Sequence, residues 1–254
     1  MDVFISIPFD LLLEKYLPLV IENKIDIEII LKQEALDTYS ISEFKKVGDQ
    51  LLENEIKITI HLPYMDLSLG ALDPLIKEIS LKRIFQGMEI STIFSPKNLV
   101  FHTGFHPFYH RTVVEEWKKI FKDSLEKIIK KGEELELTLS LENVFEPEPE
   151  FLKEFLEPFQ GKIFWCFDPG HAKIFSKKSE IEWLEVLSPY LKEIHCHDNR
   201  GEVDEHLAIG KGIINFENIW NFLRKKHIKP LLVSEAHTKE ETLYNRKYLL
   251  NLKL

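Results

Sequence analysis

The chain has 254 residues and a formal net charge of −9, with 44% hydrophobic and 30% charged residues. This length suits one domain with a single large core, and no apolar run approaches the ~18 residues that a membrane span needs. The net charge disfavours duplex DNA as a partner, because non-specific DNA binding relies on Lys and Arg. The start, Met1-Asp2-Val3-Phe4, lacks a basic leader, and the only two cysteines lie in expected strands. We therefore expect a cytoplasmic protein with reduced thiols and no membrane partner, while the oligomeric state stays open.

Short apolar segments alternate with longer helical patterns eight times along the chain. Most of the apolar segments are continuous rather than alternating, as in a parallel sheet that is covered on both faces. Eight such units predict an α/β fold, a single (β/α)8 TIM barrel domain over residues 1–254, with its active site at the C-terminal ends of the strands. The expected strands are Val3–Ile7, Asp26–Leu31, Lys57–Leu62, Leu99–Thr103, Leu135–Glu142, Ile163–Asp168, Lys192–His197 and Leu231–Glu235. The expected helices include Asp10–Asn23, Ser42–Asn54, Asp73–Phe94, Thr112–Lys131, Phe216–His227 and Lys239–Leu252.

An open doubly wound sheet is the main alternative fold. It is disfavoured because Pro8-Phe9-Asp10 follows the first strand, where such a sheet carries a Gly-rich phosphate loop. Local punctuation predicts helix starts at Asp73-Pro74 and Ser179-Glu180 and a helix end at Lys131-Gly132. The acidic, proline-spaced run from Glu146 to Glu150 is expected to form a stiff loop with solvated charges.

Potential metal ligands stand at the ends of six consecutive expected strands. The carboxyl ends of barrel strands converge on one face, where active sites of this fold lie. The densest stretch runs from Glu193 to Arg200 and on to Gly210, and its imidazoles and carboxylates suit zinc, manganese or iron. A polar rim without metal, or histidines held by backbone carbonyls, is the alternative for this stretch. The strand-end residues are His61, His102, Glu142, Asp168, His195 and Glu235, with His171 just beyond Asp168.

These motifs resemble, in the same order, those of the xylose-isomerase-like barrel superfamily, and the pattern is most similar to that of endonuclease IV. The segments that carry the resemblance are Ile60–Tyr64, Val100–Gly104, Ser140–Asn143, Cys166–His171, His195–Asp198, Asp204–Gly212 and Val233–Glu235. The resemblance implies three zinc ions that split a phosphodiester. The matching ligands are His61, His102, Glu142, Asp168, His171, His195, Asp204, His206 and Glu235.

Charge arithmetic agrees with an anionic substrate for this site. Four carboxylates bring −4 and three divalent ions bring +6, which leaves +2. Glu142 and Glu235 are expected to bridge or shape the cluster, and we expect them to act in catalysis together with His171. His106, His197 and Asp198 are candidates to orient the ligand histidines. Expected substrate contacts are Tyr64, His106, His197, Arg200 and Lys211.

Sugar isomerases and epimerases of the same superfamily are the main functional alternative. They resemble this chain through Glu142, Asp168, His195 and Glu235 around one manganese-like ion, with the two glutamates moving a proton at carbon. His61, His102, Asp204 and His206 are not needed for that chemistry, and their joint presence favours a multi-metal hydrolase.

The loops depart from the endonuclease pattern. Lys32–Tyr39 and the acidic run after strand five replace basic loops that contact DNA. The sequence therefore predicts a hydrolase with one to three divalent ions, Zn or Mn, that acts on a small anionic or sugar-like substrate. A non-catalytic barrel that only binds a metal or ligand is a third hypothesis.

Overall fold

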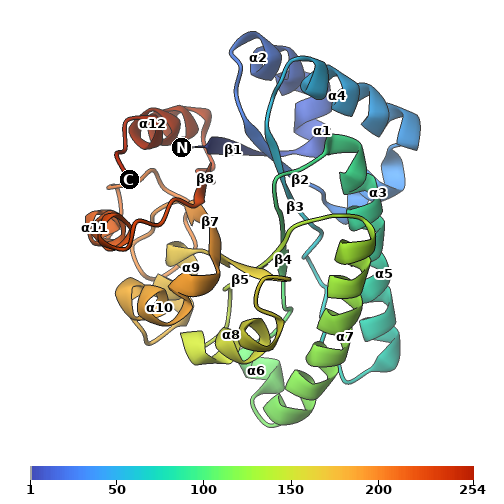
Figure 1. The fold of residues 1–254 in the computed structure, drawn as a ribbon, viewed down its shortest axis with the longest axis vertical. Coiled ribbons are helices and arrows are strands. Elements are labelled where there is room, and N and C mark those ends of the chain that lie inside the picture. The colour runs from blue at the N-terminus through green and yellow to red at the C-terminus, as the bar shows by residue number, and fades with distance from the viewer. Residues whose placement is uncertain (1) are drawn as a thin grey trace. The chain divides into compact units, whose positions relative to one another are not determined.

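Eight parallel strands form a closed barrel in chain order from β1 to β8 (Figure 1). The structure is a computed structural model and describes residues 2–254. Helices alternate with the strands, so the predicted (β/α)8 TIM barrel is confirmed and the open sheet is excluded. The strands are β1 (Val3–Pro8), β2 (Ile27–Ile30), β3 (Ile58–His61), β4 (Leu99–His102), β5 (Leu139–Glu142), β6 (Phe164–Phe167), β7 (Leu191–Cys196) and β8 (Leu231–Ser234).

The barrel strands are covered on both faces, so apolar and polar strand residues alike are buried. All four residues of β3 and all four of β5 are buried. The register between neighbouring strands fixes where the polar residues at the strand ends lie. In the β2/β3 pair, Ile27 lies opposite Ile58 and Ile30 lies opposite His61. The expected strands match the observed ones within about one residue at all ends but one, which is the usual uncertainty of a strand boundary. The exception is the strand expected over Leu135–Glu142: β5 begins at Leu139, and Leu135 is the C-cap of the preceding helix.

The chain's contacts group it into two compact units. Unit 1 holds residues 2–5 and Glu142–Leu254, and unit 2 holds Ser6–Leu141. The expectation of a single domain over the whole chain stays a prediction.

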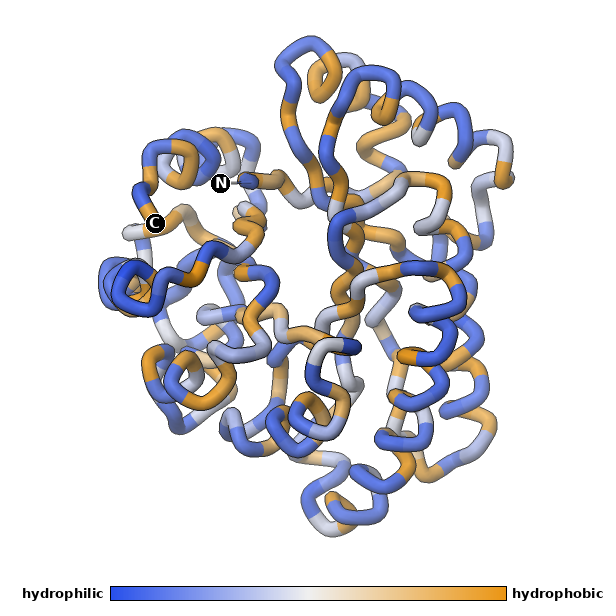
Figure 2. Tube along the Cα trace, in the orientation of Figure 1, coloured by the Kyte–Doolittle hydropathy of each residue, from blue (hydrophilic) through white to orange (hydrophobic). Residues whose placement is uncertain are grey.

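Two of the long helices of unit 2, α4 and α5, begin at side-chain caps. Ser40 and Glu43 form a capping box, and Asp73 accepts hydrogen bonds from the backbone N–H groups of Leu75 and Ile76. In Figure 2 hydrophobic and hydrophilic segments alternate along α5 and α7. The helices are α1 (Phe9–Leu11), a π-helical turn (Leu12–Tyr16), α2 (Leu17–Glu22), α3 (Gln33–Thr38), α4 (Ile41–Glu53), α5 (Pro74–Ser91), a 3-10 turn (Thr92–Phe94), α6 (Pro107–His110) and α7 (Val114–Glu134).

Helices of unit 1 also begin at side-chain caps. Ser179 and Glu182 form a capping box, as the expected helix start at Ser179-Glu180 implies, and Asp168 caps the helix that follows β6. Both free cysteines, Cys166 and Cys196, are buried, and burial raises the pKa of each thiol. The helices are α8 (Pro149–Leu156), a 3-10 turn (Glu157–Phe159), α9 (Pro169–Phe175), α10 (Glu180–Leu187), a 3-10 turn (Ser188–Tyr190), α11 (Phe216–Lys226) and α12 (Lys239–Leu250).

Two local predictions are wrong for identifiable reasons. The helix expected to stop at Gly132 continues to Glu134, because Gly132 serves close packing: a Cβ there would lie 2.7 Å from the Leu139 side chain. The acidic run is not a solvated loop throughout. Glu146 is 1% exposed and accepts a hydrogen bond from the Val144 N–H at 2.7 Å, and α8 begins at Pro149.

Among residues 2–254 we find no helix with the length and apolar character of a transmembrane span. The cytoplasmic location stays a prediction.

Candidate metal centre

Every predicted strand-end ligand lies at or beside the carboxyl end of a strand. His61, His102 and Glu142 are the last residues of β3, β4 and β5. Asp168 and Glu235 each follow the last residue of β6 and β8 directly, and His195 is the penultimate residue of β7. Seven of the nine predicted ligands belong to unit 1, and two belong to unit 2.

In unit 1, Asp168 connects two histidines. One carboxylate oxygen accepts a hydrogen bond from the His171 backbone N–H at 2.8 Å, and the other lies 2.9 Å from Nε2 of His197. Both side chains of the second pair are fully buried. Burial raises the pKa of Asp168, but the neighbouring His171 and His197 outweigh it and hold the pKa below its ordinary value. Asp168 is therefore an ionised carboxylate inside the protein.

Asp204 links two more imidazoles. Its Oδ2 atom lies 3.2 Å from Nε2 of His171 and 2.9 Å from Nε2 of His206. Burial lowers the pKa of His206, but the carboxylates of Asp204, Glu235 and Asp168 together raise it to about 9. The same contacts lower the pKa of Asp204 against the effect of burial. The predicted Asp204 and His206 thus join the predicted Asp168 and His171 in one connected group.

His195 lies between two glutamates. Its Nδ1 atom is 3.4 Å from Oε1 of Glu142 and 3.3 Å from Oε2 of Glu235. Glu142 also lies 3.1 Å from Nδ1 of His171, so it connects this group to the Asp168 group. Ligands that surround one ion at ~2.1 Å lie about 3 to 3.5 Å from each other. Nδ1 of His195 and the two carboxylates have that spacing.

In unit 2, the two predicted ligands pack against each other and against an aromatic ring. The rings of His61 and His102 are 4.9 Å apart, edge to face. Nδ1 of His61 lies 2.9 Å from the carbonyl oxygen of Leu62. The Tyr64 ring lies 4.7 Å from His102 and 5.0 Å from His61. The predicted substrate contact Tyr64 is therefore a direct neighbour of both predicted ligands.

The other expected substrate contacts occupy different surroundings. His197 is fully buried, whereas Arg200 and Lys211 are exposed and pair with Glu205 and Glu241. In unit 2 the His106 side chain accepts a hydrogen bond from the Phe108 N–H at the start of α6. His197, Arg200 and Lys211 lie next to carboxylates, and His106 caps a helix. Their contact with a substrate stays a prediction.

Sequence reasoning missed Asn143 as a scaffold for Asp168. Its side-chain oxygen accepts hydrogen bonds from the Asp168 N–H and the Trp165 indole N–H, at 3.0 and 3.1 Å. Its amide also donates to the Asp168 carbonyl at 2.7 Å. The signal was available, because an asparagine directly after a buried strand must find partners for all of its polar atoms.

Asp198, considered as a partner for a ligand histidine, instead holds the loop after β7. Its carboxylate accepts hydrogen bonds from the backbone N–H groups of Asn199, Gly210, Gly212 and Ile214. Asp198 thereby fixes the loop that carries Asp204 and His206.

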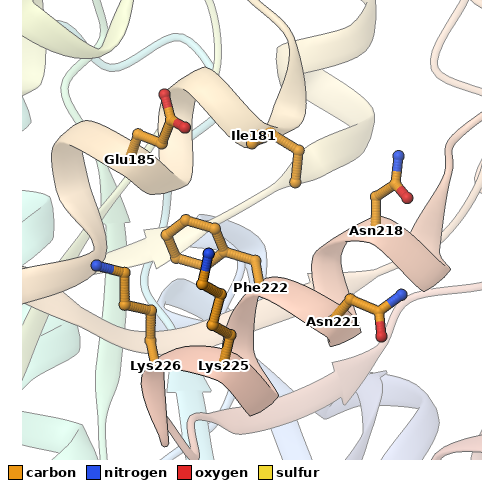
Figure 3. A pocket seen from close by; sticks show the side chains of 7 residues that line it. All are labelled: Ile181, Glu185, Asn218, Asn221, Phe222, Lys225 and Lys226. Carbon is orange, nitrogen blue, oxygen red and sulfur yellow. The ribbon is translucent and has the colours of Figure 1, made fainter.

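A separate pocket lies between α10 and α11, with a volume of ≈ 500 Å³ (Figure 3). Its lining includes Glu185 from α10 and Phe222, Lys225 and Lys226 from α11. None of the predicted site residues lines it. Its helices lie at the outer layer of unit 1, and the pocket is not part of the strand-end cluster.

The fold and this cluster define a class of protein: (β/α)8 barrels with imidazoles and carboxylates gathered at the strand ends. The family model described as "Xylose isomerase-like TIM barrel" matches residues 26–251, and the chain belongs to this family. The resemblance noted in the sequence is thus confirmed. Enzymes are known in the superfamily, and its members bind divalent metals.

Several relatives are similar over most of the chain. The uncharacterized protein MJ1614 of Methanocaldococcus jannaschii is 31% identical over 180 residues, which cover 67% of each chain. MJ1311 of the same organism is 28% identical over 67% of this chain and 61% of its own length. A probable endonuclease 4 of Aquifex aeolicus is 26% identical over 72% of this chain and 71% of its own length.

Two solved structures are similar over nearly the full length. The TTHB071 protein from Thermus thermophilus, in a crystal soaked with ZnCl2, superposes with a TM-score of 0.81 at 25% identity and covers 99% of this chain and 98% of its own. A D-tagatose 3-epimerase-like protein superposes with a TM-score of 0.84 at 22% identity over 99% and 97% of the two chains. The second likeness speaks for the fold alone.

Proposed function

We propose that this protein is a divalent-metal-dependent hydrolase that cleaves a phosphodiester in a small or non-duplex substrate. The observation that carries the proposal is the position of Asp204, whose carboxylate lies within 3.2 Å of both His171 and His206. Sugar isomerisation at a single ion does not need this second group of ligands. The 26% identity to a probable endonuclease 4 adds support.

The donor atoms of unit 1 fit a cation. Nδ1 of His197 and Oδ1 of Asp204 are buried, and neither has a hydrogen-bond partner among residues 2–254. The two atoms lie 3.7 Å apart. Buried polar atoms without partners cost free energy, and nitrogen and carboxylate oxygen together are good ligands for Zn²⁺ or Mn²⁺.

The residues divide into sets that would each hold an ion. Glu142, His195 and Glu235 form one set in unit 1. Asp168, His171, Asp204 and His206 form the second, beside Nδ1 of His197 and with Glu142 close to both sets. His61 and His102 offer two further imidazoles in unit 2. Bound divalent ions would supply Lewis acidity at a phosphoryl oxygen and make water a stronger nucleophile.

The chain's own side chains would orient the substrate and move protons. Glu142 and Glu235 are carboxylates beside the His195 imidazole, so they can accept a proton from an attacking water. His171 contacts both Glu142 and Asp204, at 3.1 and 3.2 Å, and can return a proton to the leaving oxygen. These three residues are the catalytic residues of the proposal.

Surface charge supports a small substrate. Arg200 and Lys211, the cations of the loop after β7, are each paired with a glutamate of the same chain. The net charge of −9 repels a long polyanion, while a cation cluster attracts a small anion locally. Tyr64, His106 and His197 complete the proposed substrate contacts.

Metal counting and a paired substrate screen test this function. The purified protein is stripped with a chelator, reloaded with Zn²⁺ or Mn²⁺, and assayed on bis(p-nitrophenyl) phosphate, abasic-site DNA and a ketose panel. Two or three ions per chain and metal-dependent release of p-nitrophenol are expected. Ketose epimerisation at one ion per chain, with no phosphodiester cleavage, would contradict the hydrolase.

Sugar isomerisation or epimerisation is the second candidate function. One observation favours it: the carboxylates of Glu142 and Glu235 both lie near Nδ1 of His195, at 3.4 and 3.3 Å, so a single ion site would have two carboxylates beside it that can move a proton at carbon. The same screen decides between the two.

A further inference from the structure

We propose that His237 is a substrate-binding residue of the candidate site and that its imidazole donates a hydrogen bond to a phosphoryl oxygen of the substrate. The proposal rests on the proposed function, because the phosphodiester substrate is assigned there. His237 was not among the residues expected from the sequence to act at this site. It lies three residues beyond the end of β8, between the predicted ligand Glu235 and the start of α12.

His237 is the outermost of three stacked imidazoles in unit 1. The ring centres of His197 and His206 lie 3.9 Å apart, those of His206 and His237 lie 4.2 Å apart, and the rings of each pair meet at an angle of 10°. His197 is fully buried, His206 is half-buried and His237 is exposed. The stack therefore leads from the buried part of the cluster to solvent, and His237 is the imidazole at its open end.

The backbone around His237 is fixed to the loop after β7. The His237 N–H donates to the carbonyl oxygen of His206 at 3.2 Å, and Nδ1 of His206 lies 2.8 Å from the carbonyl oxygen of Glu235. The carbonyl oxygen of Ala236 accepts a hydrogen bond from Oγ1 of Thr242 at 2.9 Å. An exposed side chain normally samples several rotamers, and ordering it on binding costs entropy. The fixed backbone and the stacked ring reduce this cost for His237.

Both ring nitrogens of His237 are available to a ligand. Neither has a hydrogen-bond or ion-pair partner among residues 2–254, whereas His197 and His206 bind Asp168 and Asp204. The hydrogen-bonding atoms of an imidazole lie in its plane, so those of His237 are directed alongside the His206 ring and not into it. An imidazole has at least one N–H donor in each of its forms, so this role does not depend on its charge.

The neighbouring groups favour an anionic oxygen as the ligand of His237. Nε2 of His206 lies 2.9 Å from Oδ2 of Asp204, and both residues belong to a set that would hold a divalent ion. A phosphoryl group has more than one free oxygen, so one oxygen can bind at this set while another accepts from His237. A hydrogen bond to a charged oxygen is roughly twice as strong as one between neutral groups, which favours a phosphodiester over a sugar hydroxyl.

A purely positioning role is the competing interpretation. The His237 ring covers one face of His206, and in this interpretation it keeps that imidazole in place without contact to the substrate. His237→Phe separates the two roles, because phenylalanine keeps a flat ring for stacking and has no nitrogen. His237→Ala removes both the ring and the nitrogens.

Steady-state kinetics of the Zn²⁺-loaded full chain on bis(p-nitrophenyl) phosphate, with ions counted by mass spectrometry, tests the proposal. For His237→Phe we expect KM to rise about 10-fold, as for loss of one hydrogen bond to a charged group, with kcat and the number of bound ions unchanged. His227→Asn is the control, because His227 is an exposed histidine after α11 and asparagine tolerates its left-handed backbone. Its kinetics should equal those of the wild type.

Binding of inorganic phosphate gives a second readout that does not need turnover. Calorimetry on the same Zn²⁺-loaded proteins should show that phosphate binds the wild type about 10-fold more tightly than His237→Phe. Equal phosphate affinity of the two proteins, or no phosphate binding by the wild type, would overturn the role of His237.

The outcomes separate the two levels of inference. A wild type that binds phosphate more tightly than His237→Phe but cleaves no phosphodiester contradicts the proposed function and supports the anion contact. A His237→Phe variant that equals the wild type while His237→Ala is impaired overturns the substrate contact in favour of positioning. Loss of one ion per chain in both His237 variants overturns it as well, because His237 would then be a metal ligand.

Discussion

The two units carry predicted ligands of different chemistry. In unit 1, carboxylates and imidazoles alternate, as in the contacts of Asp168 with His197 and of Asp204 with His206. In unit 2, His61 and His102 pack on each other and on Tyr64, which is a group of aromatic rings. Carboxylates compensate the charge of a divalent ion, while imidazoles alone add affinity without compensating it. The predicted ligands of unit 1 therefore include anionic and nitrogen donors, whereas the two predicted ligands of unit 2, His61 and His102, are imidazoles.

The largest expected effect is the loss of a unit 1 carboxylate. Glu142→Gln removes the group that contacts both His171 and His195, so we expect the rate of phosphodiester cleavage to fall about 10²- to 10⁴-fold. The thermal midpoint should change little once the protein is metal-free. Steady-state kinetics under saturating Mn²⁺ gives the rate. Unchanged turnover would show that Glu142 has no part in the mechanism. It would also contradict the larger role given to the carboxylates of unit 1.

Removal of the unit 2 histidines should have a smaller effect. The double variant His61→Ala/His102→Ala is expected to bind one ion fewer per chain and to lose cleavage activity on the order of 100-fold, because the ions of unit 1 keep their carboxylates. Ion counting after dialysis checks this result. His227→Ala, at a left-handed position after α11, is a control outside both clusters. Equal ion counts in the double variant and the wild type would show that unit 2 binds no metal.

A pair of glycine variants separates damage to the cluster from damage to the core. A Cβ at Gly170 would lie 2.3 Å from the His197 ring, and a Cβ at Gly70 would lie 2.4 Å from the Trp117 ring. Each substitution to Ala should lower the free energy of unfolding by about 1–3 kcal/mol through overpacking. Only Gly170→Ala should also weaken Zn²⁺ binding. Urea unfolding and a Zn²⁺ titration measure the two effects, and equal loss of Zn²⁺ affinity in both would show general loosening.

The smallest expected effect concerns a surface ion pair of unit 2. Arg83 donates to both carboxylate oxygens of Asp37, and this lowers the pKa of Asp37 below 3.8. Because the folded pKa is depressed, the stabilisation is present above about pH 3.8 and disappears as the pH falls through the folded pKa. Asp37→Asn should slightly lower the urea midpoint at pH 7, and the difference from wild type should shrink in acid. A constant difference across the acid range would argue against the charge as its cause.

The fold was predictable because it depends on patterns that repeat along the chain. Val3–Ile7 or Leu231–Glu235 can be recognised as buried strands from continuous apolar residues alone, and eight such strands define the barrel. The helix expected over Asp10–Asn23 is present, but it includes a π-helical turn at Leu12–Tyr16. The residue types in this segment do not predict such a turn. The helix end predicted at Gly132 is wrong because a sequence does not show that Leu139 packs against this glycine.

The strand-end positions of the candidate ligands can be predicted from the sequence, but their contacts cannot. His195, Glu142 and Glu235 were recognised from their positions at strand ends and from the superfamily resemblance. The role of Asn143 as a scaffold, and the stacking of His237 on His206, depend on side-chain orientation between segments that are distant in sequence. No local pattern encodes that orientation.

The two buried cysteines allow local opening of the barrel strands to be measured by thiol alkylation. Cys166 and Cys196 are protonated and hidden from solvent, so an alkylating reagent cannot reach them while the strands stay packed. Their labelling rate in native buffer therefore measures how often β6 and β7 separate from their surroundings. If bound cations fasten the strand ends, alkylation should slow when Zn²⁺ is added, without any engineered probe.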